Sequence, residues 1–230
     1  MHPISHRRVL PSVLLLFVAC ALGVMALSLL RYPAFFALPG AQFAVIEPVC
    51  ALLAYSVAIV LVARLRGTLW EAIRKTATIY GILSGSIEMI DIGFENGVPF
   101  KVGGPMLPLV FMLAVFALWG IAGFAAARRL GSFKAGLLAA IGSAGICMLA
   151  AVAAGFLIEL LLAPPAPAYV STWAEFQRSG WTDARAFGIA NTFDSGFTHL
   201  VAAPVVASVL GTVASFLVRL NGRKAASPAG

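Results

Sequence analysis

The sequence predicts an all-α protein that crosses a membrane several times, and three observations support this class. Hydrophobic residues make up 61% of the 230 residues and charged residues only 11%, whereas a soluble domain has about 45–50% and about 25%. The mean hydropathy is +0.97, and apolar runs of the length that crosses a bilayer recur along the chain. The basic residues also gather at alternate ends of these runs. This composition excludes an ordinary soluble enzyme, a disordered chain and a nucleic-acid-binding domain.

Six apolar runs are predicted to be transmembrane helices. They cover about 9–30, 43–63, 77–95, 105–127, 135–162 and 195–218. The first run follows Arg7 and Arg8 but is too long for a secretory signal, so we expect it to be retained as a span. The third run is the least hydrophobic, and Pro204 in the sixth predicts a kink. We expect one transmembrane bundle over 1–224 and a disordered tail over 225–230.

The basic residues set the predicted orientation. One set of span ends holds twelve of the sixteen Lys and Arg: Arg7, Arg8, Arg64, Arg66, Arg74, Lys75, Arg128, Arg129, Lys134, Arg219, Arg223 and Lys224. The other set holds four: Arg31, Lys101, Arg178 and Arg185. Because cytoplasmic loops carry the excess of Lys and Arg, both termini are predicted to be cytoplasmic. The chain is predicted to lie in a bacterial-type cytoplasmic (inner) membrane, with the lipid bilayer as its main partner.

Two segments are not predicted to cross the membrane. Residues 68–76 mix Leu69, Trp70 and Ile73 with charged residues and predict a short cytoplasmic amphipathic helix, with Trp70 at the headgroups. The long external connection, about 163–194, begins with an extended proline-rich exit. Its aromatic residues predict an interfacial lid, and a plain membrane-surface anchor is the alternative. Ser171 or Thr172 is expected to cap a short helix within it.

The acidic residues are distributed unevenly along the chain. Of nine, only Glu71 is on the predicted cytoplasmic side, and Glu175 and Asp183 fall in the external connection. The other six lie in the outer half of a span or at its outer end: Glu47, Glu88, Asp91, Glu95, Glu159 and Asp194. This pattern is the most informative feature for function, because an ionisable residue inside a span is costly and marks a functional site by default.

The third span places three carboxyls on one stripe. At about 100° per residue, Asp91 and Glu95 lie within about 60° of Glu88. Gly81, Ser84 and Gly85 share this face and allow a neighbouring helix to approach closely. A carboxylate that faces lipid costs a few kcal/mol, so the stripe is predicted to face the bundle interior or a water-filled cleft. For Glu95 the alternative is a solvated turn residue beyond the membrane.

The other outer polar residues have two interpretations each. Asn191, Asp194 or Ser195 is expected to cap the sixth span, and His199, one turn deeper, is either a structural hydrogen-bonding residue or a titratable one. Glu47, just before a proline, fits stabilisation by the helix N-terminal dipole equally well.

Together these residues predict one outward-facing acidic pocket. Its candidate ligand- or cation-binding residues are Glu47, Glu88, Asp91, Glu95, Glu159, Asp194 and His199. The pocket requires the second, third, fifth and sixth spans to meet. Several carboxylates in a low-dielectric pocket cannot all ionise alone, so either some are protonated or a cation binds. A zinc site is less favoured, because His199 is the one membrane-placed histidine and no ligand-spaced motif exists. No cofactor is predicted.

Three functional hypotheses follow from the sequence. The first is a small transport or solute- or cation-binding protein that uses the acidic pocket. The alternative is a non-catalytic subunit or assembly partner of a membrane complex, with the polar stripe buried against helices of other membrane protein subunits. The third is a membrane hydrolase that uses a carboxylate and His199. The chain has no phosphate-binding Gly-rich loop, HExxH or GxSxG motif, and no catalytic residue is predicted.

Overall fold

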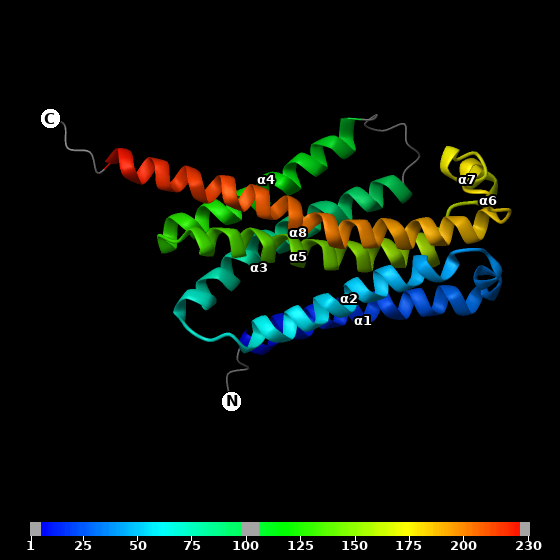
Figure 1. Ribbon diagram of the computed structural model, residues 1–230, viewed down its shortest axis with the longest axis horizontal. Coiled ribbons are helices and arrows are strands. Elements are labelled where there is room, and N and C mark those ends of the chain that lie inside the picture. Colours follow the sequence, from blue (N-terminus) through cyan, green and yellow to red (C-terminus); the bar gives the residue numbers. More distant parts are fainter. Residues whose placement is uncertain (1–5, 98–105, 226–230) are drawn as a thin grey trace. The chain divides into compact units, whose positions relative to one another are not determined.

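The computed structural model describes residues 6–97 and 106–225, and all regular structure within them is helical (Figure 1). The helices are α1 His6–Arg31, η1 Pro33–Ala37, α2 Ala41–Arg64, α3 Thr68–Gly97, α4 Met106–Leu130, α5 Phe133–Phe156, η2 Leu157–Leu162, α6 Pro167–Val170, α7 Ala174–Ser179 and α8 Ala184–Ala225. The predicted all-α class is confirmed. The tail predicted to be disordered lies, beyond Ala225, outside the described residues.

Five helices are long and apolar enough to cross a membrane. They are Val9–Arg31, Ala41–Arg64, Met106–Leu130, Phe133–Leu162 and Ala184–Asn221. The chain is therefore a multi-pass membrane protein by its helices. The predicted third span belongs to α3, which is long enough but is not among the five. The carboxylates of Glu88 and Asp91 and several hydroxyls interrupt its apolar stretch.

The amphipathic helix predicted over 68–76 is not a separate element. It forms the first part of α3, which continues without a break to Gly97. No proline or glycine stands between Thr68 and Tyr80 to end a helix. The side chain of Thr76 donates to the carbonyl oxygen of Ala72 at 3.1 Å, and this local bond is compatible with a helix interior.

The chain groups into two compact units. The first unit comprises Met1–Ala63, Ile92–Pro99 and Leu149–Leu200, and the second comprises Arg64–Asp91, Phe100–Met148 and Val201–Gly230. The helices α3, α5 and α8 each contribute residues to both units. The expectation of a single bundle over 1–224 stays a prediction, and each unit is described on its own.

Aromatic rings form the core of the first unit. Phe193 on α8 lies between Phe35 of η1 and Phe156 of α5, with ring centroids 6.2 and 5.7 Å away. Trp181 of the α7–α8 connection packs edge-on against Phe35 at 6.3 Å. Phe35, Phe156 and Phe193 are fully buried. These contacts dock the end of α5, the connection and the start of α8 onto the turn between α1 and α2.

The external connection is shorter than predicted, because α8 begins at Ala184 rather than near 195. It contains two short helices, α6 and α7. The predicted capping by Ser171 or Thr172 is wrong, since Trp173 precedes α7 and no side chain caps that helix. The two hydroxyls instead donate backwards, to the carbonyl oxygens of Ala168 and Tyr169. Small polar residues satisfy local turns as readily as helix ends, which explains the error.

Small residues form the core of the second unit. A Cβ added at Gly136 of α5 would lie 2.7 Å from the carbonyl oxygen of Gly123 on α4, and one at Gly123 would lie 3.1 Å from Cα of Gly211 on α8. The α4–α5 turn is short, with Gly131 at φ +59° and the Ser132 hydroxyl accepting from the backbone N–H of Ala135. Side chains of this size let helix backbones approach closely.

Candidate functional site

The two units divide the seven candidate residues. Glu47, Glu95, Glu159, Asp194 and His199 belong to the first unit, and Glu88 and Asp91 to the second. Among the residues that the structure describes, no three or more His, Cys, Asp or Glu side chains form a group that could hold a metal ion. The functional chemistry of each unit therefore depends on smaller arrangements.

Glu159 faces α8 within the first unit. It lies in η2, a π-helical turn in which the N–H of Ala163 bonds the carbonyl oxygen of Ile158 at 2.7 Å. The half-buried carboxylate accepts a hydrogen bond from the hydroxyl of Thr192 at 3.0 Å. Thr192 is buried and lies 3.1 Å from the carbonyl oxygen of Gly188 as well. π-Helical turns occur often at functional sites, and this one points an acidic side chain between helices.

The polar run at the start of the predicted sixth span forms one face of α8. Its exposed members follow the spacing i, i+3, i+4, i+7, i+8 and are Asn191, Asp194, Ser195, Thr198 and His199. We call these five residues the α8 polar face. The opposite side of the same turns packs inward through Phe193, Gly196 and Leu200, which are buried.

The predicted capping role of Asn191, Asp194 or Ser195 is wrong. The helix begins well before them, and Asp183 performs the capping: its Oδ1 accepts from the backbone N–H groups of Arg185 and Ala186 at 2.9 and 3.0 Å. An Asp just before a helical run is a normal N-terminal signal. The sequence contained that signal. The helix that follows it was not predicted, because residues 184–199 mix polar and apolar side chains.

Two hydrogen bonds fix the level of the α8 polar face within the first unit. Tyr32, just after α1, donates to Asp183 at the start of α8, and Tyr55 in the middle of α2 donates to the carbonyl oxygen of Leu200 at 2.9 Å. The polar face lies between these two contacts, on about 25 Å of helix from Asp183 to Leu200. The second contact joins this part of α8 to α2, a helix apolar enough to cross a membrane.

His199 lies at the inner end of this face. Its Nδ1 is 2.7 Å from the carbonyl oxygen of Ser195, one turn earlier. Because a carbonyl oxygen only accepts, Nδ1 is assigned the hydrogen, and Nε2 of the neutral ring is left as an acceptor. The exposed ring can therefore accept a hydrogen bond through Nε2 from a donor outside the helix.

Glu47 and Glu95 are less informative. Glu47 is exposed and lies in the second turn of α2, which begins at Ala41 and has no acidic residue in its first turn. The stabilising effect of the helix dipole falls off within the first turn, so the dipole explanation for Glu47 is weaker than the sequence indicated. The side chain of Glu95 lies outside the described residues.

In the second unit, Glu88 and Asp91 are half-buried on α3, above a close helix contact. A Cβ at Gly81 would lie 2.7 Å from Cβ of Ile146 on α5, which confirms the predicted close approach of a neighbouring helix at this glycine. Ser84, one turn further, is fully buried and accepts a hydrogen bond from the indole N–H of Trp119 at 3.2 Å.

A polar cluster beside the turn between α1 and α2 was not predicted. Asp183 accepts from the Tyr32 hydroxyl, and the Arg185 guanidinium lies 5.0 Å from the centre of the Tyr32 ring. Burial alone would raise the pKa of Asp183, but hydrogen bonds from Tyr32 and from the backbone of Ala186 and Arg185 outweigh it and lower the pKa. The same hydrogen bond, with partial burial, raises the pKa of Tyr32.

Comparison with known protein families, with curated proteins and with solved structures found no match. The site is therefore interpreted from its own chemistry.

Proposed function

We propose that the protein is a six-span inner-membrane protein that binds or transports a small cation, a proton included, through a site in the outer half of the bundle. In this proposal α3 also crosses the membrane and is the third of six spans, and both termini are cytoplasmic. The site in the first unit consists of Glu159 and the α8 polar face. The twelve-to-four distribution of basic residues supports the orientation.

The observation that carries the proposal is the position of the α8 polar face alongside an apolar helix. Asp194 and His199 are exposed alongside α2, an apolar helix, rather than beyond its end. Ionisable residues at such a depth rarely face lipid, and they line water-filled cavities or bind other groups. A helix that keeps five polar residues on one face at this level is therefore expected to border water or a ligand.

The positions on α8 also favour a path for a cation or a proton. Thr192, Ser195 and His199 follow the spacing i, i+3, i+7 and so share one side of the helix. Glu159 bonds the first of them, and His199 contacts the second. This row places a carboxylate, two hydroxyl groups and an imidazole along about two turns of α8.

Glu159→Gln tests the proposal, because it keeps the size of the side chain and removes the negative charge. Glu175→Gln is the matched control, since Glu175 is an exposed carboxylate on α7 paired with Arg178. The assay measures uptake of protons and of a panel of inorganic cations and small amines into proteoliposomes, and thermal stabilisation by the same cations. We expect loss of uptake or stabilisation in Glu159→Gln alone. Equal behaviour of the two variants for every cation would reject the proposal.

The exposure of the same polar face also favours a second candidate function, that of a subunit in a membrane complex. Exposed polar residues at bilayer depth are satisfied equally well by a hydrogen-bonding helix of another protein. Ser195→Cys in a chain without Cys20, Cys50 and Cys147 distinguishes the two. Labelling by a membrane-impermeant maleimide in native membranes supports a water-filled site, and protection that is lost on purification supports a covering subunit.

A further inference from the structure

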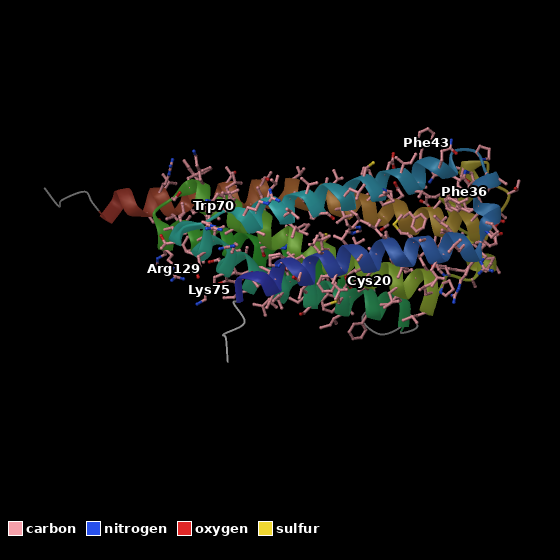
Figure 2. All side chains as sticks on the ribbon, turned by 90° about the horizontal axis from the view of Figure 1, so that it is seen from below. Cys20, Phe36, Phe43, Trp70, Lys75 and Arg129 are labelled. Carbon is pink, nitrogen blue, oxygen red and sulfur yellow. The ribbon has the colours of Figure 1, made fainter. Side chains whose placement is uncertain are left out.

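Four helix ends meet at one end of the second unit, and each brings basic residues. The start of α3 supplies Arg74 and Lys75, the end of α4 Arg128 and Arg129, the start of α5 Lys134 and the last part of α8 Arg219. We call these six residues the basic patch. Figure 2 shows Trp70, Lys75 and Arg129 gathered at this end of the unit. Within the described side chains around these helix ends, Glu71 is the one acidic residue.

Specific contacts hold the four helix ends together. Ile73 of α3 packs in a buried cluster with Ala126 of α4 and Ala135 of α5, and Trp70 and Leu130 border it. On α8, the Arg219 guanidinium lies 5.2 Å from the centre of the Phe133 ring at the start of α5. The basic patch is therefore built on packed helices rather than on separate loops.

The surroundings of the patch indicate what it binds. Five of its six side chains are exposed, and Arg74 is half-buried. Directly beside them, Leu69 of α3 and Phe216, Leu217 and Leu220 of α8 are also exposed. Cationic side chains next to an apolar surface, with Trp70 between them, are typical of the headgroup region of a bilayer. There the phosphates of lipids meet their acyl chains. A nucleic acid or an acidic peptide would bind the cations but leave the adjacent apolar side chains uncovered.

We propose that the basic patch is a binding site for the headgroups of anionic phospholipids. The arginines at the end of α4 present planar guanidinium groups that bind phosphate oxygens in pairs, whereas Lys75 and Lys134 act as point charges. The site is distinct from the one proposed in the first unit, so either proposal can fail without the other.

The test compares two variants that each remove two exposed arginines. Arg128→Gln/Arg129→Gln changes the patch, and Arg31→Gln/Arg178→Gln is the control in the first unit. Purified full-length protein in neutral detergent is titrated with phosphatidylglycerol, phosphatidylcholine or inorganic phosphate, and the shift in melting temperature gives the apparent affinity. Taking the shift relative to each variant's own starting point removes any change in basal stability.

We expect phosphatidylglycerol to stabilise the protein and the control variant alike, with no effect of phosphatidylcholine or inorganic phosphate at the same concentration. Each charge near an anionic surface contributes roughly a fivefold change in affinity, so the patch variant is expected to bind about 25-fold more weakly. Arg128→Lys/Arg129→Lys should restore part of this loss. Equal loss in both double variants, or an equal response to phosphatidylcholine or phosphate, would overturn the proposal.

Discussion

The two units pack their helices in different ways, although α5 and α8 take part in both. In the first unit, Phe156 of α5 and Phe193 of α8 interlock as rings. In the second, Gly136 of α5 and Gly211 of α8 bring backbones close together. One side of α8 is exposed in both units. It is polar in the first, as at Asp194 and Ser195, and apolar in the second, as at Val205 and Val209.

The two units also differ in which polar side chains they bury. The second unit buries Ser84 and bonds it to Trp119. It also buries Ser143, whose hydroxyl has no hydrogen-bond partner among the described residues. The first unit buries Thr192 against Glu159 but leaves Asp194 and His199 exposed. The first unit therefore leaves ionisable side chains open, whereas the second encloses its hydroxyl groups between helices.

The largest expected effect is on the ring packing. Phe193→Ala removes a fully buried ring that contacts Phe35 and Phe156, and such a cavity costs about 3–5 kcal/mol. Phe36→Ala is the control, because Phe36 is exposed and adjoins Phe35 at the edge of the cluster. We expect less than ~1 kcal/mol for the control in unfolding by a denaturing detergent. Similar losses in both variants would contradict the proposed core.

The glycine packing is tested by two Gly→Ala variants. One is expected to lower the free energy of unfolding, and its control is expected to raise it. Gly136→Ala places a methyl group 2.7 Å from the backbone oxygen of Gly123, and overpacking of this kind costs about 1–3 kcal/mol. Gly120→Ala on α4 has open space around its new Cβ. Because alanine favours a helix by roughly 0.5–1 kcal/mol over glycine, that control is expected to be stabilised. The same unfolding assay measures both, and two changes of the same sign would contradict the close contact.

How far the sequence predicts this fold depends on the residue types involved. The apolar runs located five long helices to within a few residues at most ends, because hydrophobic length dominates there. The start of α8 was missed by about ten residues, since Ala184–His199 mixes polar and apolar residues. The π-turn at Leu157–Leu162 has no signal in its sequence, because a run of leucines fits an α-helix equally well.

The candidate site was predictable in its residue types but not in its pairings. The sequence predicted that Glu159 and His199 lie in outer halves of spans. The partner of Glu159 is Thr192, a residue near the start of the polar run. Which side of a helix faces its neighbour depends on where the helix starts and how it is rotated. Both follow from long-range contacts such as Tyr55 with Leu200, which a sequence pattern does not encode.

A third prediction concerns how α2 supports α8. Pro204 lacks the N–H that would bond the carbonyl oxygen of Leu200 four residues earlier, and the Tyr55 hydroxyl donates to that oxygen instead. Tyr55→Phe is expected to destabilise the protein by about 1 kcal/mol. With Pro204→Ala as background, the helix supplies its own donor and the cost of Tyr55→Phe should shrink. An unchanged cost in the two backgrounds would show that the hydroxyl does not replace the missing bond.

The smallest effect is expected beside the turn between α1 and α2, where Tyr32→Phe removes the hydrogen bond to Asp183. The lowered pKa of Asp183 means that this contribution is complete above the carboxyl's ordinary value of 3.8 and disappears as pH falls through the lower folded value. The raised pKa of Tyr32 means that it is complete below 10.0 and disappears as pH rises through the higher folded value.

The stability difference between the wild type and Tyr32→Phe should therefore form a plateau between these limits and decline on both sides. Because both side chains are only half-buried and solvent screens their interaction, the plateau is expected to stay below ~1 kcal/mol. Tyr169→Phe, at an exposed tyrosine of α6, is the control and should show no such pH dependence. A difference that stays constant into the acid range would mean that the Tyr32 hydroxyl stabilises the turn independently of the charge on Asp183.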